Sequence, residues 1–360
     1  MPAAKTKIHS PKNYRSRIVI SAILIVIGLF LVIWLQQSRT SAHSQSNDSQ
    51  DTNSQDTAGQ AAFAPRNSST PSKAEVRSNY VETTIQYGNG DGQIGIIRGA
   101  GGQPVSGPES FTIGADGSVY LADQVNQRVL VYSNGGELLR SISISGIGLA
   151  DLTVDGKGNI YVYDDAERRL SQFSSDGSLL KNLLLNPADI VSRGYVHIEG
   201  QSVYFANSAN TDILIASVQD GILTAADLNS DRNSDGIHSV TGKVYSIDVT
   251  RGQDLQVRVH NDSENLDEQQ FTVSLPGILS ATYVGEDQNG QFYIQTERSD
   301  GTAIALEVQK FDMKGQLLAT TRMPETDYAL GTTKLLEVGN DGAIVQFLPQ
   351  NDQATLQIFQ

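Results

Sequence analysis

A segment that begins at residue 117 recurs 41 residues later, and this repeat constrains the fold more than any other feature of the sequence. GSVYLADQVNQRVLVYSNGGELL, from Gly117, aligns without gaps with GNIYVYDDAERRLSQFSSDGSLL, from Gly158. The same turn followed by an aromatic or apolar residue returns, at spacings of 41 to 52 residues, at Tyr204, Tyr245, Tyr293 and Val345. Repeats with such a period are typical of propellers, solenoids and related arrays.

Within each repeat the residue pattern is that of short β-strands. Side chains alternate between two faces in residues 119–122, and Asp-Gly pairs at 116–117 and 176–177 mark turns between strands. No segment of helical length after residue 35 keeps a 3.6-residue period. Four short strands per repeat, six times over, predict an all-β, six-bladed β-propeller across residues 80–360.

The best-preserved repeat resembles the NHL repeat. It matches the strand-Asp-x-x-Asn-x-Arg-Val-x-aromatic pattern of that family at Asp123, Asn126, Arg128, Val129 and Tyr132. The second repeat keeps Asp164, Arg169 and Phe173, whereas the third has Asp212 in place of the Arg. The resemblance extends over residues 109–360 and implies a ring of six blades. We expect the repeated Asp, Asn and Arg to hold the blades together, since Asx residues favour turns.

One strand-like segment has no place in the first five repeats. After Gly331 the chain supplies only three strands, whereas VETTIQY at 81–87 alternates like a strand and stands alone. We predict that it completes the last blade and joins the two ends of the ring. Such closure removes exposed sheet edges.

The segment 18–35 (IVISAILIVIGLFLVIWL) carries no charge and is long enough to cross a bilayer. Residues 1–17 form a basic tail with five positive charges, and Arg39 is the nearest charge on the other side. The positive-inside rule therefore predicts a single-pass signal-anchor helix in the cell membrane, with the N-terminus cytoplasmic. Cleavage after Thr40-Ser41-Ala42 is the alternative, but the apolar run exceeds a usual signal h-region.

Residues 36–79 are rich in Ser, Gln and Asn and too polar to form a core, so we expect a disordered tether. The propeller would then lie outside the cell, attached to the lipid bilayer through 18–35, as a bacterial envelope protein. We expect it to be a monomer.

Charge and composition exclude several functions. Residues 80–360 carry a net charge of −19 within a chain total of −14, so nucleic acid is not expected as a partner. The chain contains no cysteine, which excludes disulfides, thiolate metal sites and thiol nucleophiles.

A partial calcium motif occurs at DRNSDG. Asp231, Asn233 and Asp235 alternate before Gly236, as in the first half of a calcium-binding loop. The distal bidentate Glu is missing, because Gly242 stands at the twelfth position. The alternative is a polar loop rich in turn-forming residues, and no other cofactor is indicated.

Four residues are candidates for a site in the propeller channel. The fold resembles calcium-dependent lactonases, which implies acidic and amide side chains on inner strands around the channel mouth. The comparable residues in this sequence are Glu109, Asp151, His197 and Glu199. No Gly-x-Ser-x-Gly elbow or Walker loop is present.

These observations favour a membrane-tethered binding or scaffold module over an enzyme. Its loops would bind an envelope protein, a peptide or a glycan. The alternatives are a metal-dependent, lactonase-like hydrolase or lyase with its site in the channel, and a purely structural envelope component. Fold alone does not decide among them.

Overall fold

The computed structural model describes residues 80–99, 105–186, 194–207, 210–226, 234–250, 254–261, 264–299, 301–324 and 331–360. In this part of the chain, 24 strands pair into six antiparallel sheets of four strands each. None of these residues belongs to a helix that could cross a membrane. The expected basic tail, membrane helix and tether (1–17, 18–35 and 36–79) lie outside the described residues.

Each of the first five sheets, here called blades, contains four strands that are consecutive in sequence. Blade 1 consists of β2 (Phe111–Ile113), β3 (Val119–Asp123), β4 (Arg128–Tyr132) and β5 (Leu138–Ser143). Blade 2 consists of β6 (Asp151–Val154), β7 (Ile160–Asp164), β8 (Arg169–Phe173) and β9 (Leu179–Leu184). Blade 3 consists of β10 (Gly194–Glu199), β11 (Ser202–Asn207), β12 (Asp212–Gln219) and β13 (Ile222–Ala225).

The second and third strands of blades 4 and 5 are eight residues long, against five in blades 1 and 2. Blade 4 consists of β14 (Ile237–His238), β15 (Lys243–Thr250), β16 (Asp254–Asn261) and β17 (Glu264–Ser274). Blade 5 consists of β18 (Ile278–Glu286), β19 (Phe292–Ser299), β20 (Ile304–Phe311) and β21 (Leu317–Arg322). Blade 6 consists of β22 (Leu336–Val338), β23 (Ile344–Pro349), β24 (Gln353–Phe359) and β1 (Tyr80–Gln86).

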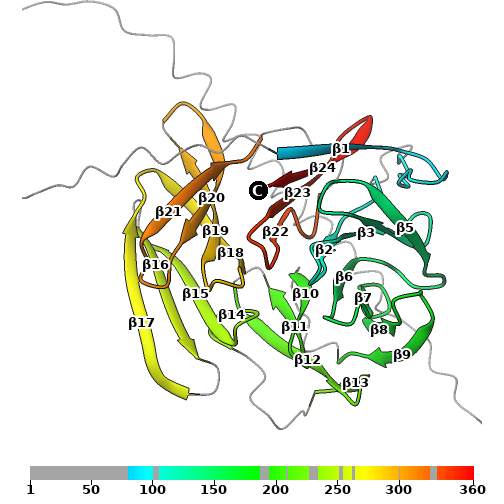
Figure 1. Ribbon diagram of the computed structural model, residues 1–360, viewed down its shortest axis with the longest axis horizontal. Coiled ribbons are helices and arrows are strands. Elements are labelled where there is room, and N and C mark those ends of the chain that lie inside the picture. Colours follow the sequence, from blue (N-terminus) through cyan, green and yellow to red (C-terminus); the bar gives the residue numbers. More distant parts are fainter. Residues whose placement is uncertain are drawn as a thin grey trace, which may run out of the picture. The chain divides into compact units, whose positions relative to one another are not determined.

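The composition of blade 6 confirms the predicted ring closure. Strand β1 pairs antiparallel with β24 in a continuous register from Tyr80 opposite Phe359 to Gln86 opposite Gln353. The two ends of the propeller are therefore hydrogen-bonded side by side (Figure 1). Only Ile85 of β1 is buried, and it joins the core cluster between blades 6 and 1.

The first strand of each blade lies nearest the centre of the ring (Figure 1). Strand β2 contacts β6 and β22, β6 contacts β10, and β18 contacts β22. The repeated aromatic on the second strand packs between blades, with Tyr161, Tyr245 and Tyr293 almost fully buried. A turn Asp before the second strand anchors two of these rings, since Asp155 and Asp287 accept hydrogen bonds from the hydroxyls of Tyr161 and Tyr293.

The repeated Asp and Arg of blades 1 and 2 form intrablade ion pairs. Arg128 Nε lies 2.7 Å from Asp123 Oδ2, and Arg169 Nη2 lies 3.0 Å from Asp164 Oδ2. Each Asp also accepts a backbone N–H from the segment that leads into a blade, Gly95 for Asp123 and Gly148 for Asp164. These residues therefore join strand ends to interblade connections, as expected for an architectural role.

Candidate functional site

A pocket of about 280 Å³ lies among the inner strands of blades 3 to 6. Strands β10, β14 and β18 and the segment leading into β22 contribute its walls. Its ionisable and aromatic lining residues include Tyr195, His197, Glu199, His238, Tyr283, Glu286, Lys334 and Glu337. A cavity at the centre of a propeller gathers side chains that are far apart in sequence, and here it gathers both signs of charge.

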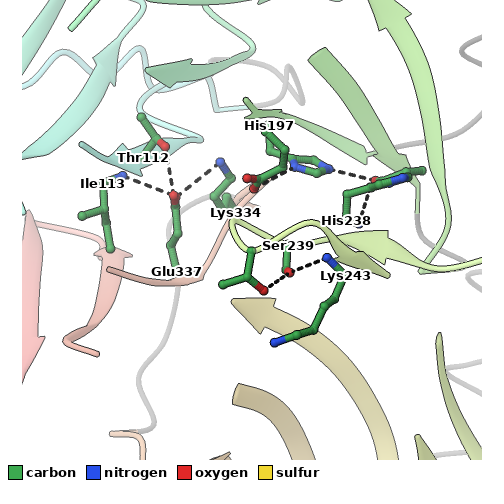
Figure 2. Close-up of polar contacts among 11 residues, drawn as sticks. Thr112, Ile113, His197, His238, Ser239, Lys243, Lys334 and Glu337 are labelled. Carbon is green, nitrogen blue, oxygen red and sulfur yellow. Dashed lines mark hydrogen bonds and ion pairs between the residues drawn. The ribbon is translucent and has the colours of Figure 1, made fainter. Parts of the chain in front are cut away.

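A buried carboxylate joins two histidines at one side of the pocket. His197 Nε2 lies 2.9 Å from Asp212 Oδ1, and His238 Nδ1 lies 3.0 Å from Asp212 Oδ2 (Figure 2). The backbone N–H of His238 also donates to Asp212 Oδ2, at 2.7 Å. Asp212 starts the third strand of blade 3, whereas the histidines lie on the first strands of blades 3 and 4. The carboxylate thus links two adjacent blades.

The charge state of this cluster follows from its contacts. Burial alone would lower the pKa of His197, but the Asp212 carboxylate and Glu199 raise it to about 10. Burial opposes ionisation of Asp212, yet His197 and the hydrogen bonds from His238 hold the pKa of Asp212 below its usual value. At neutral pH the pair is therefore imidazolium and carboxylate, so His197 acts as a fixed cation.

Glu199 lies on the other side of His197. Its Oε1 is 3.7 Å from His197 Nδ1, beyond direct hydrogen-bonding distance. Burial raises the pKa of Glu199, and the nearby His197 only partly offsets this effect. The protein therefore only partly compensates the negative charge of ionised Glu199.

The ring of Tyr204 packs against both histidines. Tyr204 stacks on His238 with ring centroids 4.1 Å apart and on His197 with centroids 5.4 Å apart. The three rings form a layer beside the pocket, and stacking of this kind adds to the rigidity of a site.

A second polar network crosses the centre from blade 6 to blades 1, 2 and 3. Glu337 Oε1 accepts hydrogen bonds from Thr112 Oγ1 at 2.9 Å and the Ile113 N–H at 3.3 Å, and Glu337 Oε2 lies 3.4 Å from Lys334 Nζ (Figure 2). Lys334 also lies over the ring of Tyr195, 5.2 Å from its centroid. Burial alone would lower the pKa of Lys334, but Glu337 and Asp151 raise it, so the ammonium stays charged.

Glu286 and Lys243 form a third ion pair at the pocket. Glu286 Oε1 accepts from Lys243 Nζ at 2.6 Å, and its Oε2 accepts from Thr241 Oγ1 at 2.5 Å. This carboxylate is buried and fully engaged on both oxygens.

Among the described residues that line the pocket, Tyr283 is the one whose hydroxyl is buried without a hydrogen-bond partner. Its side chain is 4% exposed and stacks on Tyr245 with ring centroids 4.7 Å apart. Burial raises the pKa of Tyr283 far above its ordinary value, and Tyr245, Glu286 and Glu199 raise it further. The hydroxyl is therefore protonated and stands within electrostatic range of two carboxylates.

The four channel candidates from the sequence have different positions. His197 and Glu199 line the pocket. Asp151 is buried behind it, where it accepts hydrogen bonds from Ser110 Oγ and the Val196 N–H, and burial raises its pKa. Glu109 is half-buried outside the pocket lining, and its carbonyl accepts the Thr333 N–H.

Sequence reasoning missed Asp212, His238, Tyr283, Lys334 and Glu337. A signal existed for Asp212, because it occupies the repeat position that carries Arg128 and Arg169 in blades 1 and 2. A carboxylate at a position that carries Arg in the first two repeats cannot form the same ion pair with an Asp, so it indicates that this residue has a different partner in blade 3. No comparable signal marks Tyr283 or Lys334.

The calcium motif is only partly described. Asp231 and Asn233 lie outside the described residues, whereas Asp235 is exposed and lies 3.1 Å from Arg258 Nη1. Across the described ranges, no three His, Asp or Glu side chains are grouped so that they could hold a metal ion.

Fold and site together define a six-bladed β-propeller with a charged pocket at its centre. No protein-family model and no curated protein matches the sequence.

Three solved structures with a similar chain course are remote in sequence. A member of the duf4221 family from Bacteroides vulgatus is 11% identical, with 79% of this chain and 97% of that chain covered and a TM-score of 0.47. Virginiamycin B lyase from Staphylococcus aureus is 12% identical (78% and 100% covered, TM-score 0.42), and hydrazine synthase from Kuenenia stuttgartiensis is 13% identical (70% and 76% covered, TM-score 0.44). Similarity at this level does not allow a ligand or an activity of these proteins to be inferred for this chain.

Proposed function

We propose that this chain is a membrane-tethered, extracytoplasmic binding module with NHL-like repeats, and that it binds a small ligand in the channel pocket. The anchor and tether rest on the charge asymmetry and polarity of residues 1–79. The binding role rests on one observation, the pocket of about 280 Å³ with its preassembled charged walls. Concave sites with a few fixed polar groups are the usual form of small-molecule sites.

The state of His197 supports binding rather than turnover. A general base must be able to accept a proton near the working pH. His197 has a pKa of about 10 and is held by Asp212, so it is already protonated at neutral pH. A fixed imidazolium suits recognition, because its position and charge do not depend on the ligand.

The second candidate is a hydrolase or lyase that uses His238. Its Nδ1 contacts Asp212, and a carboxylate on one imidazole nitrogen orients the ring for proton transfer at the other. Turnover of a lactone and ester panel by the wild type, abolished in His238→Ala, would establish this alternative. We expect no turnover.

The binding function is tested by filling the pocket. Val284 lies on β18 in the pocket wall, so Val284→Trp should occupy the cavity. We expect a panel of small polar compounds to contain members that raise the Tm of the full-length wild type but not of Val284→Trp, because ligands stabilise only the state that binds them. Circular dichroism of the unliganded variant checks that it folds. Identical responses in both proteins would refute the proposal.

A further inference from the structure

We propose, resting on the function above, that the channel pocket recognises a small organic ammonium compound, with its nitrogen between Glu199 and Tyr283 and its apolar part against the aliphatic wall. Both residues line the pocket, from β10 and β18. The proposal depends on the charges around the cavity, one unsatisfied hydroxyl and the character of the walls.

The cavity is short of positive charge. The carboxylates that line the pocket or contact its lining residues outnumber the fixed cations by four to three among the described residues. The carboxylates are Glu199, Asp212, Glu286 and Glu337, and the cations are His197, Lys243 and Lys334. A buried, uncompensated carboxylate is costly, so a ligand cation would stabilise the ionised form.

Glu199 has the longest ion-pair distance of these four carboxylates. Asp212 contacts two histidines, Glu286 contacts Lys243, and Glu337 contacts Lys334. Among the described residues, Glu199 forms an ion pair with His197 alone, at 3.7 Å, and that imidazolium already contacts Asp212 at 2.9 Å. Its side chain is 19% exposed, which leaves room for a ligand atom.

Tyr283 supplies an independent observation. Tyr283 is one of the residues that line the pocket, and its hydroxyl is buried and has no hydrogen-bond partner. An ammonium group has three N–H donors and no acceptor, so it can donate to the Tyr283 oxygen and to the Glu199 carboxylate together. A carboxylate ligand in the same place would meet Glu199 and Glu286 as like charges.

The remaining walls limit the ligand further. Ile237, Val284, Leu336 and Val338 make part of the lining apolar, and the ring of Tyr195 already accepts the ammonium of Lys334 on its face. Aromatic faces attract organic cations in this way. A volume of about 280 Å³ lies at the lower end of small-molecule sites. The class of ligand that fits these walls is therefore a compact monoamine.

The test uses three probes of one size and different charge: n-butylamine, 1-butanol and butyrate. Each is titrated at pH 7 into the full-length protein in nanodiscs, and the apparent Kd is obtained from the shift in Tm. We expect butylamine to bind more than tenfold tighter than the other two. Glu199→Gln should weaken amine binding at least tenfold and Tyr283→Phe about threefold or more.

The controls separate binding from folding. Tyr283→Phe should keep or raise the Tm of the unliganded protein, because the lost hydroxyl has no partner. Glu137→Gln removes an exposed carboxylate outside the pocket lining and should leave amine binding unchanged.

The other outcomes are also decisive. Tighter binding of butyrate, or a compound panel that binds the pocket while butylamine does not, would overturn the ammonium class and leave the binding function standing. Equal butylamine binding by wild type and Val284→Trp would place the amine outside the pocket and overturn the inference. If no compound distinguishes these two proteins, the binding function itself fails.

Discussion

Asp212 shows how one change in a repeat can replace a structural ion pair within a blade by contacts beside the pocket. The same repeat position carries Arg128 and Arg169 in blades 1 and 2, where each Arg pairs with an Asp of its own blade. In blade 3 the carboxylate instead contacts His197 and His238. The repeat alignment identifies residue 212 as the changed position. It does not identify the two histidine partners, because they lie on the first strands of two blades, and an alignment does not show how close those strands come to each other.

Removing the charge of Asp212 should destabilise the protein strongly. Asp212→Asn would leave the half-buried His197 imidazolium without its main partner, the fully buried Asp212 carboxylate, and breaking a buried pair costs about 3 kcal/mol or more. Urea denaturation at pH 7 measures the loss, with Glu137→Gln as an exposed control expected to change stability by less than about 0.5 kcal/mol. A similarly small effect of Asp212→Asn would contradict the proposed charge state.

His197 should also make stability depend on pH on the alkaline side. Its folded-state pKa of about 10 exceeds the ordinary value of 6.5, so its stabilisation is complete below pH 6.5 and is lost as the pH rises toward 10. The free energy of unfolding should fall in this window by up to about 1.4 kcal/mol per pH unit.

The matched variant for this pH effect is His197→Gln, which keeps a donor for Asp212 but cannot titrate. Denaturation curves at pH 6.5, 8 and 9.5 should show a shallower decline for the variant than for the wild type. Parallel declines would mean that other groups cause the pH dependence.

At the scale of elements, the strands were largely predictable and the pocket was not. Alternation and the Asp-Gly turn at 116–117 located β3, the repeat 41 residues later located β7, and the orphan segment at 81–87 was correctly assigned to the last blade. These signals are local in sequence. The pocket instead depends on the spacing of first strands from four blades, including the two-residue β14 that carries His238.

The closing strand β1 allows a matched test of its packing. Ile85 is 1% exposed in the core between blades 6 and 1, whereas Val81 on the same strand is 38% exposed. Ile85→Ala should lower the free energy of unfolding by about 2 to 4 kcal/mol, as for other buried Ile truncations. Val81→Ala should cost less than about 1 kcal/mol. Equal effects measured by thermal or urea unfolding would contradict the packing of β1 in the ring.

At the scale of the whole molecule, the proposed tether would give the propeller access to ligands outside the cell. Protease added to intact spheroplasts should cut within residues 36–79 or degrade the propeller, because the five positive charges of residues 1–17 favour a cytoplasmic N-terminus. An antibody against the propeller would follow the loss, with a cytoplasmic protein as the integrity control. Full protection of the propeller would refute this orientation.

The central claim is that the channel pocket binds an amine between Glu199 and Tyr283. A crystal structure of the protein with n-butylamine at pH 7 tests it most directly. We expect difference density in the pocket, with the amine nitrogen within hydrogen-bonding distance of the Glu199 carboxylate and the Tyr283 hydroxyl. Amine density found only outside the channel, with the pocket holding solvent alone, would contradict the claim.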